Sequence, residues 1–150
     1  MPDTTLLVSD VMSSPPVVVR THDSLWRAMD RFLATGLRHL VVLDESDVVI
    51  GVLDDRAVVS EWARDALGLH QRTVGALMRV SATRTVAVTR DTPVQEAARL
   101  MLERRVDALP VVGSDGRVVG VLTGSDLVRT VVKGQAGQPD GTPAPSGAAR

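Results

Sequence analysis

Cysteine is absent from this 150-residue sequence, and the aromatic residues are limited to one phenylalanine and two tryptophans. Without cysteine the chain forms no disulfide, thiolate zinc site or cysteine nucleophile, and a reducing compartment, the cytoplasm, is expected. The three histidines, His22, His39 and His70, lack the spacing of a metal-ligand pair. No metal site is therefore predicted.

Long apolar runs and clustered positive charge are also missing. Apolar stretches such as residues 40–43 fall far short of the roughly 20 residues that span a bilayer, so no membrane is expected as a partner. The net charge is -1, Lys133 is the only lysine, and the arginines are spread along the chain, which argues against nucleic acid as a partner. The sequence contains no Gly-x-Ser-x-Gly elbow, Walker loop or HExxH motif, so no catalytic residues and no enzyme activity are predicted.

The sequence does contain an internal repeat. A shift of 69 residues places residues 25–28 on 94–97, residues 39–42 on 108–111, and residues 49–53, Val-Ile-Gly-Val-Leu, on 118–122, Val-Val-Gly-Val-Leu. A repeat of this length indicates one supersecondary unit that is present twice.

Each copy has the same order of hydrophobic patterns, which predicts strand, helix, strand, strand, helix. The predicted strands are 17–19, 40–43 and 48–53 in the first copy, and 86–88, 109–112 and 117–122 in the second. Asp23 and Thr92 are the expected N-caps of the first helix in each copy. The closing helices are predicted at 56–67 and 125–132, and the turn between 43 and 48 requires a positive φ at Asp47.

The predicted fold class is therefore α+β, with two β-α-β-β-α repeats at residues 9–67 and 73–132 that pack with pseudo-twofold symmetry. One such unit exposes a face of its small sheet, so neither copy is expected to be stable alone. Residues 133–150 are rich in glycine and proline and lack apolar periodicity, and they are predicted to be a disordered tail.

The second copy carries the more distinctive residues. Residues 106–112 read Val-Asp-Ala-Leu-Pro-Val-Val, and residues 116–127 read Gly-Arg-Val-Val-Gly-Val-Leu-Thr-Gly-Ser-Asp-Leu. This pattern resembles the CBS domain family, whose domains occur as tandem pairs called Bateman modules. The first copy has the same pattern of strands but differs at three positions. It has Val41 where the family usually has proline, Asp54 where the family usually has threonine or serine, and Ala57 where the family usually has aspartate.

The resemblance implies a regulatory module that binds AMP, ADP, ATP or S-adenosylmethionine between its repeats, requires no cofactor, and relays occupancy to a partner. Carried over to this sequence, the ligand-binding residues are Val17, Leu37, Arg38, His39, Val121, Thr123 and Asp126. The mirror-image cleft would combine Asp54 and Ala57 with Val86, Val106, Asp107 and Ala108. Only the first cleft is expected to be competent, because Asp54 would repel a phosphate and Ala57 offers a ribose no hydrogen bond.

The chemistry of the first cleft follows from its residue types. Thr123 comes where a strand gives way to a helix, so free N–H groups are expected for a phosphate, and Asp126 can accept hydrogen bonds from ribose hydroxyls. Arg38 and His39 can bind phosphate oxygens, and the three apolar residues can enclose an adenine. An alternative without a ligand exists for each of these residues. Residues 123–126 also match a capping box, which stabilises a helix without any ligand. Arg38 can equally be an arginine in contact with solvent, and His39 a histidine at the start of a strand.

Two functions are compatible with the sequence. The first is an adenosyl-nucleotide sensor that acts in trans on a regulated protein, whose identity the sequence does not reveal. The alternative is a ligand-independent oligomerisation or docking module, such as a homodimer, whose apolar helix faces comprise Met29, Phe32, Trp62, Ala98 and Met101.

Overall fold

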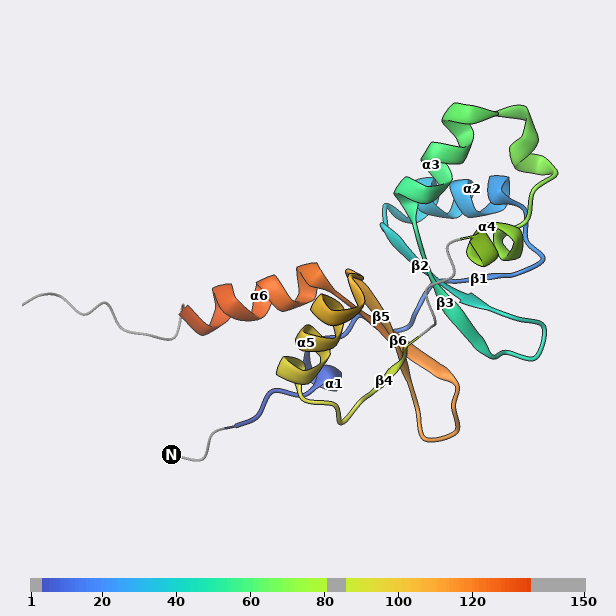
Figure 1. Cartoon of the computed structure of the whole chain (residues 1–150). Helices are drawn as coiled ribbons and strands as arrows, with labels where there is room; N and C mark the ends of the chain where they lie inside the picture. Colours follow the sequence, from blue (N-terminus) through green and yellow to red (C-terminus); the bar gives the residue numbers. More distant parts are fainter. Residues whose placement is uncertain (1–3, 81–85, 136–150) are drawn as a thin grey trace, which may run out of the picture.

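The computed structural model describes residues 4–80 and 86–135 and contains two small three-stranded sheets, each with its own helices (Figure 1). The first sheet consists, in order, of β1 (Val18–Arg20), β2 (His39–Leu43) and β3 (Val49–Asp54). The second consists of β4 (Val88–Thr89), β5 (Ala108–Val112) and β6 (Val118–Thr123). In each sheet the first pair of strands is parallel and the second antiparallel, which confirms the α+β fold with two β-α-β-β-α repeats.

The helices follow the strands in the predicted order. The first repeat contains α2 (Leu25–Thr35), α3 (Asp55–Arg64) and the short 3-10 helix η1 (Leu67–His70). The second contains α5 (Val94–Arg104) and α6 (Gly124–Gln135). Two further helices, α1 (Val8–Val11) and α4 (Val74–Val80), precede the first strand of the first and of the second repeat, respectively. None of the described helices is both long and apolar enough to cross a membrane.

Several helix ends differ from the prediction. The helix predicted at 56–67 ends at Arg64, because Asp65 leaves helical geometry and its Oδ1 accepts a hydrogen bond from Gly68 N–H at 3.0 Å. The last helix continues to Gln135, so Lys133 is helical although the sequence assigns it to the disordered tail. Residues 136–150, the rest of that predicted tail, lie outside the described residues.

The predicted N-caps were also wrong by one residue in both repeats. Ser24 caps α2, because its side chain accepts from Arg27 N–H at 3.1 Å, whereas Asp23 Oδ2 accepts from Arg20 N–H at 2.8 Å. Pro93 is the N-cap of α5, and Thr92 Oγ1 accepts from Thr89 N–H instead. Asp23 and Thr92 thus close the turn before the helix rather than the helix itself.

The two repeats agree in detail along the offset of 69. The β2–β3 ladder shifts register between Val42 and Leu43, and the β5–β6 ladder does so between Val111 and Val112. The turns that connect these strands have positive φ angles, 63° at Asp47 and 78° at Gly116, as the sequence predicted for Asp47. The repeat in the sequence is therefore a repeat in backbone geometry.

The short helices α1 and α4 are exchanged between the repeats, which the sequence did not predict. Val8 of α1 is fully buried in the core of the second repeat, and its N–H donates to Thr92 O at 2.9 Å. Val74 of α4 is fully buried in the core of the first repeat, and its N–H donates to Asp23 O at 2.9 Å. Figure 1 shows the blue α1 beside β4 of the second repeat. Each repeat therefore completes its core with a segment that precedes the other.

Each repeat has a separate hydrophobic core between its sheet and its helices. The first includes Val19, Leu25, Phe32, Leu40 and Leu53, and the second includes Val88, Met101, Leu109 and Leu122. Phe32 and Met101, expected on an exposed docking face, are both only 5% exposed. That part of the docking prediction was wrong, because these side chains belong to the apolar stripe with which each helix packs on the core of its own repeat.

Candidate functional site

A cleft of about 340 Å³ lies at the seam between the repeats. The seven residues predicted from the sequence all line it: Val17, Leu37, Arg38, His39, Val121, Thr123 and Asp126. Its other walls come from residues 13–16, Gly36, Asp107, Gly124, Ser125 and Arg129. The cleft is thus built by the segment before β1, the connection from α2 to β2, and the β6–α6 junction, which belong to different repeats.

The β6–α6 junction is held by a reciprocal set of hydrogen bonds between Thr123 and Asp126. Asp126 Oδ2 accepts from Thr123 N–H at 2.9 Å and from Thr123 Oγ1 at 3.0 Å, and Thr123 Oγ1 accepts from Asp126 N–H at 3.3 Å. This is the geometry of a capping box. The helix-stabilising interpretation of this motif is therefore confirmed, while its role in binding a ligand stays a prediction.

The expected free N–H groups at the start of α6 are largely occupied. Besides the contacts just described, Gly124 N–H donates to Asp107 O at 2.8 Å. Three of the backbone donors at this junction, those of Thr123, Gly124 and Asp126, thus have partners within the chain. The prediction that this helix end presents open N–H groups to a phosphate was wrong for those three.

Asp126 is 4% exposed and has a basic partner that the sequence reasoning missed. Arg129 Nη1 donates to Asp126 Oδ1 at 2.9 Å, so both oxygens of this carboxylate have intramolecular partners. The i, i+3 spacing on one helix was the signal that predicts such a pair. Oδ2 already accepts two hydrogen bonds, whereas Oδ1 accepts only the one from Arg129 among the residues that the structure describes, so Oδ1 can accept one more hydrogen bond without losing its partner.

Across the cleft lie two basic residues, Arg38 directly before β2 and His39 at its first position. Asp55 N–H donates to Arg38 O at 3.1 Å, which fixes the backbone there in the same way that Gly124 fixes Asp107 in the second repeat. Within the described part of the chain, no carboxylate lies within 4.0 Å of the Arg38 guanidinium. Of the two arginines that line the cleft, Arg38 is therefore the one more available to an anion.

His39 contacts an acidic side chain of the other repeat. Its Nε2 lies 3.1 Å from Asp107 Oδ1, and Asp107 Oδ2 lies 3.5 Å from Arg56 Nη2. The sequence placed Asp107 in the mirror-image cleft, whereas the structure also places it in the wall of the first. Which cleft Asp107 lines depends on where it lies relative to the seam between the repeats. The spacing of residues in the sequence does not give that position.

The apolar residues of the cleft are partly open to solvent. Leu37 is 43% exposed, and Val17 and Val121 are half-buried. Val17 is held because its carbonyl accepts from Val41 N–H at 3.0 Å, and Val121 pairs with Ser13 through two backbone hydrogen bonds of 2.9 and 3.0 Å. An apolar wall with a few converging polar groups is the usual composition of a small-molecule site.

The residues of the mirror-image cleft have structural roles. Asp54 is the N-cap of α3, and its Oδ1 accepts from Ala57 N–H at 2.7 Å, as the capping interpretation of this residue predicted. Ala108 is buried in β5, and Val106 packs against the core of the second repeat. Val86 is half-buried in the segment before β4. That this second cleft binds no ordinary nucleotide stays a prediction.

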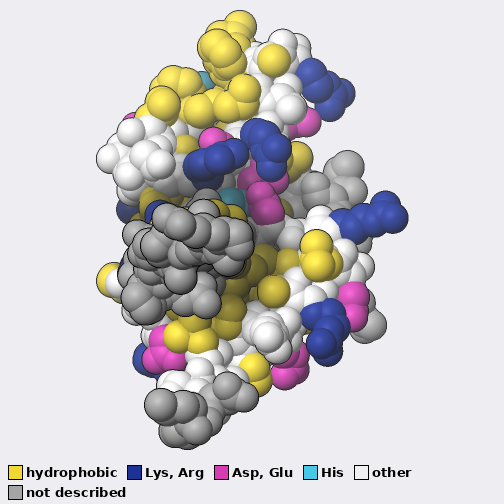
Figure 2. All heavy atoms as spheres, turned by 90° about the vertical axis from the view of Figure 1, so that its left-hand side faces the viewer, with side chains coloured by type: hydrophobic (Ala, Val, Ile, Leu, Met, Phe, Trp, Pro, Cys, Tyr) yellow, Lys and Arg dark blue, Asp and Glu magenta, His cyan; other side chains and the backbone are white. Residues whose placement is uncertain are grey.

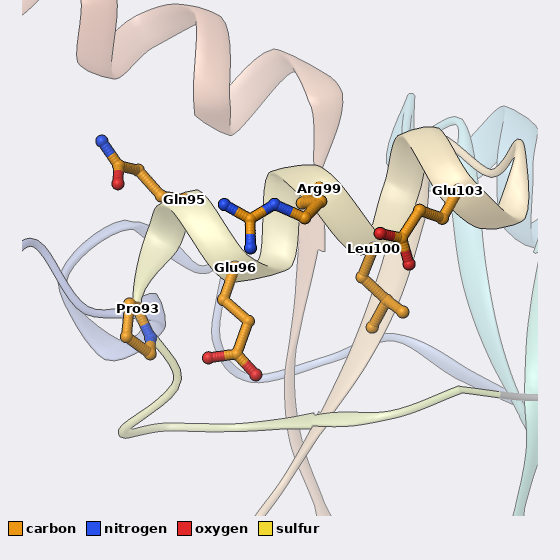
Figure 3. Close-up of a pocket in the computed structure, with 6 residues that line it drawn as sticks. All are labelled: Pro93, Gln95, Glu96, Arg99, Leu100 and Glu103. Atoms are coloured by element: carbon orange, nitrogen blue, oxygen red, sulfur yellow. The ribbon is translucent and has the colours of Figure 1, made fainter.

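A hollow of about 490 Å³ beside α5 does not share the features of the cleft. It is lined by Pro93, Gln95, Glu96, Arg99, Leu100 and Glu103. Figure 3 shows that all of these side chains come from α5 or the residue before it, so a single element lines this hollow. Binding sites bring together groups from several elements, which favours the cleft at the seam.

The remaining histidines show no metal-ligating arrangement. The His70 ring stacks on Trp26 with ring centroids 4.7 Å apart. Within residues 4–80 and 86–135, no three histidine or acidic side chains come together in a way that could hold a metal ion.

Comparisons with known proteins agree with this architecture. The profile of the family described as CBS domain matches residues 8–64 and 74–133. An L-aspartate semialdehyde sulfurtransferase from Methanocaldococcus jannaschii is 29% identical over 125 residues, which cover 82% of this chain and 23% of that protein. The chloroplastic CBS domain-containing protein CBSX2 of Arabidopsis thaliana is 27% identical over 139 residues, which cover 77% of this chain and 58% of that protein. The chain thus spans less than two thirds of either relative.

Solved structures match both repeats together. The crystal structure of CBSX2 in complex with AMP aligns with a TM-score of 0.69 at 28% identity and covers 86% of this chain and 98% of that one. The CBS domain pair of protein MJ0100, in complex with 5′-methylthioadenosine and S-adenosyl-L-methionine, aligns with a TM-score of 0.72 at 24% identity. That alignment covers 87% of this chain and 98% of the other, and it shows the same fold.

Proposed function

The chain belongs to the CBS domain family, and from this premise we propose that its cleft binds an adenosyl compound and that occupancy regulates a partner protein. The ligand class comprises AMP, ADP, ATP and S-adenosylmethionine. The observation that carries the proposal is the position of Thr123 and Asp126 opposite Arg38 and His39 in one cleft. A relative of 28% identity was crystallised with AMP, which supports the same ligand class.

Different residues of the cleft bind different parts of a nucleotide ligand. The adenine lies among Val17, Leu37 and Val121, whose side chains are apolar and half-open. The Asp126 carboxylate accepts from a ribose hydroxyl at Oδ1, which has one acceptor site left. Arg38 supplies a planar guanidinium that binds phosphate or carboxylate oxygens in a bidentate manner. In this arrangement the ligand touches both repeats, so occupancy stabilises their association.

The capping role of Asp126 needs an experiment that separates it from ligand binding. Asp126→Ala removes both roles, whereas Asp54→Ala removes the N-cap of α3, outside the lining of the cleft. Loss of a cap costs about 1 kcal/mol of stability. We expect both variants to melt at a lower temperature, and only Asp126→Ala to lose its response to ligand.

Thermal unfolding with each of the four ligands tests the proposal. A ligand at 100 times its Kd stabilises the folded state by about 2.7 kcal/mol, so the wild type and Asp54→Ala gain several degrees in Tm. A wild-type Tm that is unchanged by all four ligands would sink the proposal, and so would an Asp126→Ala variant that still responds fully.

A second candidate function is a homodimer or docking module, favoured by apolar residues that are exposed at equivalent positions of both repeats. Leu33 of α2 is 77% exposed and its counterpart Leu102 of α5 is 81% exposed. Val59 and Trp62 of α3 correspond to Val128 and Val131 of α6, and all four are exposed. Figure 2 shows hydrophobic side chains gathered at the top of the molecule, over the end that Figure 1 assigns to α3 and η1.

We expect these six positions to form the self-association face, because equivalent exposed sets on two similar repeats are suited to an isologous contact. The regulated partner is proposed to be a separate protein that binds this dimer. Sedimentation velocity of the variant Leu33→Glu with Leu102→Glu should show a monomer, whereas Val48→Glu, an exposed valine before β3, should remain dimeric. A wild type that sediments as a monomer at all concentrations contradicts this candidate.

Catalysis is not part of the proposal. Two contacts between side chains that line the cleft, Arg129 with Asp126 and His39 with Asp107, occupy its acidic groups, and the roles assigned above are binding roles. An adenosyl ligand is therefore expected to be recovered unchanged after incubation with the protein.

A further inference from the structure

The cleft carries as much negative as positive formal charge. Among the residues that line it, Arg38 and Arg129 are cationic and Asp107 and Asp126 are anionic, with His39 as the remaining titratable group. A site that binds a polyphosphate needs an excess of cationic groups or backbone donors, because each phosphate brings further negative charge. The charge count here does not provide that excess.

Contacts within the chain further reduce the number of cleft groups that can bind an anion. Arg129 is paired with Asp126 at 2.9 Å, and His39 is paired with Asp107 at 3.1 Å. The start of α6 contributes little, because three of the backbone N–H groups at the β6–α6 junction are bonded within the chain. Of the two arginines that line the cleft, Arg38 is the one with no carboxylate within 4.0 Å among the described residues.

Asp107 stands at the position of the second repeat that corresponds to Arg38 in the first, since the two are 69 residues apart and their carbonyls accept equivalent hydrogen bonds. The two repeats thus place opposite charges at the same structural position. The Asp107 side chain is 55% exposed and faces the cleft beside His39. A phosphate chain that extends beyond Arg38 and His39 approaches this carboxylate.

We propose, on the basis of the proposed function, that the cleft selects adenosyl ligands with a single anionic group over those with a polyphosphate, and that Asp107 is the residue that rejects the longer chain. AMP satisfies Arg38 with one phosphate. ADP and ATP bring additional phosphates next to Asp107, where like charges repel, because Arg56, which contacts Asp107 Oδ2 at 3.5 Å, does not itself line the cleft. The selection acts on the distal end of the ligand and leaves the adenosine contacts unchanged.

Calorimetric titration of the full chain with AMP, ADP and ATP tests this proposal. The titrations are made at low ionic strength, because salt screens charge repulsion, and without divalent cations, because Mg²⁺ binds phosphates and neutralises them. We expect the Kd to rise in the order AMP, ADP, ATP, with about a tenfold or greater difference between the first and the last. Raising the salt concentration should narrow that difference.

Asp107→Asn is the test variant, because the amide keeps the hydrogen-bonding capacity toward His39 and removes the charge. We expect it to lower the ratio of the ATP and AMP dissociation constants by about fivefold, at an almost unchanged Kd for AMP. Glu45→Gln is the matched control, since it removes one negative charge from the β2–β3 turn, outside the cleft lining, and should leave the ratio unchanged.

The outcomes distinguish a failure of the selection by Asp107 from a failure of adenosyl binding itself. If none of the three nucleotides and no S-adenosylmethionine binds, both proposals fall. If AMP binds but ATP binds equally well, or if Asp107→Asn leaves the ratio of the dissociation constants at its wild-type value, adenosyl binding stands and the selection by Asp107 is refuted.

Discussion

Gly120 of β6 approaches Ser13 so closely that a Cβ on Gly120 would lie 2.8 Å from the Ser13 carbonyl oxygen and 2.8 Å from the Met12 Sδ. The segment after α1 pairs with β6 at this point and then forms one wall of the cleft. Only glycine allows this approach, so the glycine of the Val-Val-Gly-Val-Leu stretch couples the N-terminal segment to the second repeat.

The first prediction follows from this contact. Gly120→Ala should destabilise the fold by about 1–3 kcal/mol, the usual effect of overpacking, because a carbonyl of the backbone cannot move aside like a flexible side chain. Gly134→Ala is the control, since nothing lies within 4 Å of its added Cβ and alanine favours a helix. Urea unfolding should show a lower midpoint for the first variant and an equal or higher midpoint for the second. Equal midpoints for Gly120→Ala and the wild type would refute the coupling.

The exchange of α1 predicts that the second repeat cannot fold alone. A chain of residues 68–135 lacks Val8, which is fully buried in the core of that repeat. Its far-ultraviolet circular dichroism should show little of the expected helix content, and a synthetic peptide of residues 4–17 should restore part of it. A cooperative thermal transition of the isolated repeat without the peptide contradicts the role assigned to α1.

A further prediction concerns the ion pair between Arg72 and Glu61, which ties the segment after η1 to α3. Arg72 also donates to Asp65 O at 3.0 Å, and the Glu61 side chain is only 15% exposed. Arg72→Ala leaves this carboxylate partly buried without its main partner and should cost about 1–3 kcal/mol of stability. Arg64→Ala removes the more exposed partner of Glu61 and should change stability by less than about 0.5 kcal/mol. Equal losses in the two variants, measured by urea unfolding, would show that this pair does not hold the segment.

Arg129 provides a prediction about the cleft itself. Because Arg129 pairs with the nearly buried Asp126, Arg129→Ala leaves that carboxylate without its cationic partner and should lower the Tm. Arg117→Ala is a suitable control, since its contact with Asp115 is at 4.0 Å between exposed groups. A Tm for Arg129→Ala as high as that of the control would mean that solvent already stabilises the Asp126 charge.

Much of the fold could be predicted from the sequence because the decisive signals are local. The offset of 69 and the alternating apolar strands predicted both sheets, and the short turn before β3 predicted the positive φ at Asp47. The helix caps were missed by one residue, because neighbouring polar side chains such as Asp23 and Ser24 compete for the same donors. Element boundaries depend on that local competition.

The exchange of α1 and α4 could not be predicted from the sequence. Val8 and Val74 are apolar residues in short helices, and nothing in their neighbourhood shows which repeat buries them. The seven cleft residues came from the resemblance to CBS domains rather than from residue chemistry alone. The contacts that set the charge of the cleft, from Arg129 and from Asp107 across the seam, depend on three-dimensional packing.

The contact of an adenosyl ligand with both repeats can be measured directly at the backbone amides of the cleft. Two-dimensional NMR of the isotope-labelled chain during titration with AMP should shift the backbone amides of residues 37–39 and 123–126 together and with one dissociation constant, because the ligand joins two repeats. Shifts confined to residues 93–103 beside α5, or to only one side of the seam, would contradict it.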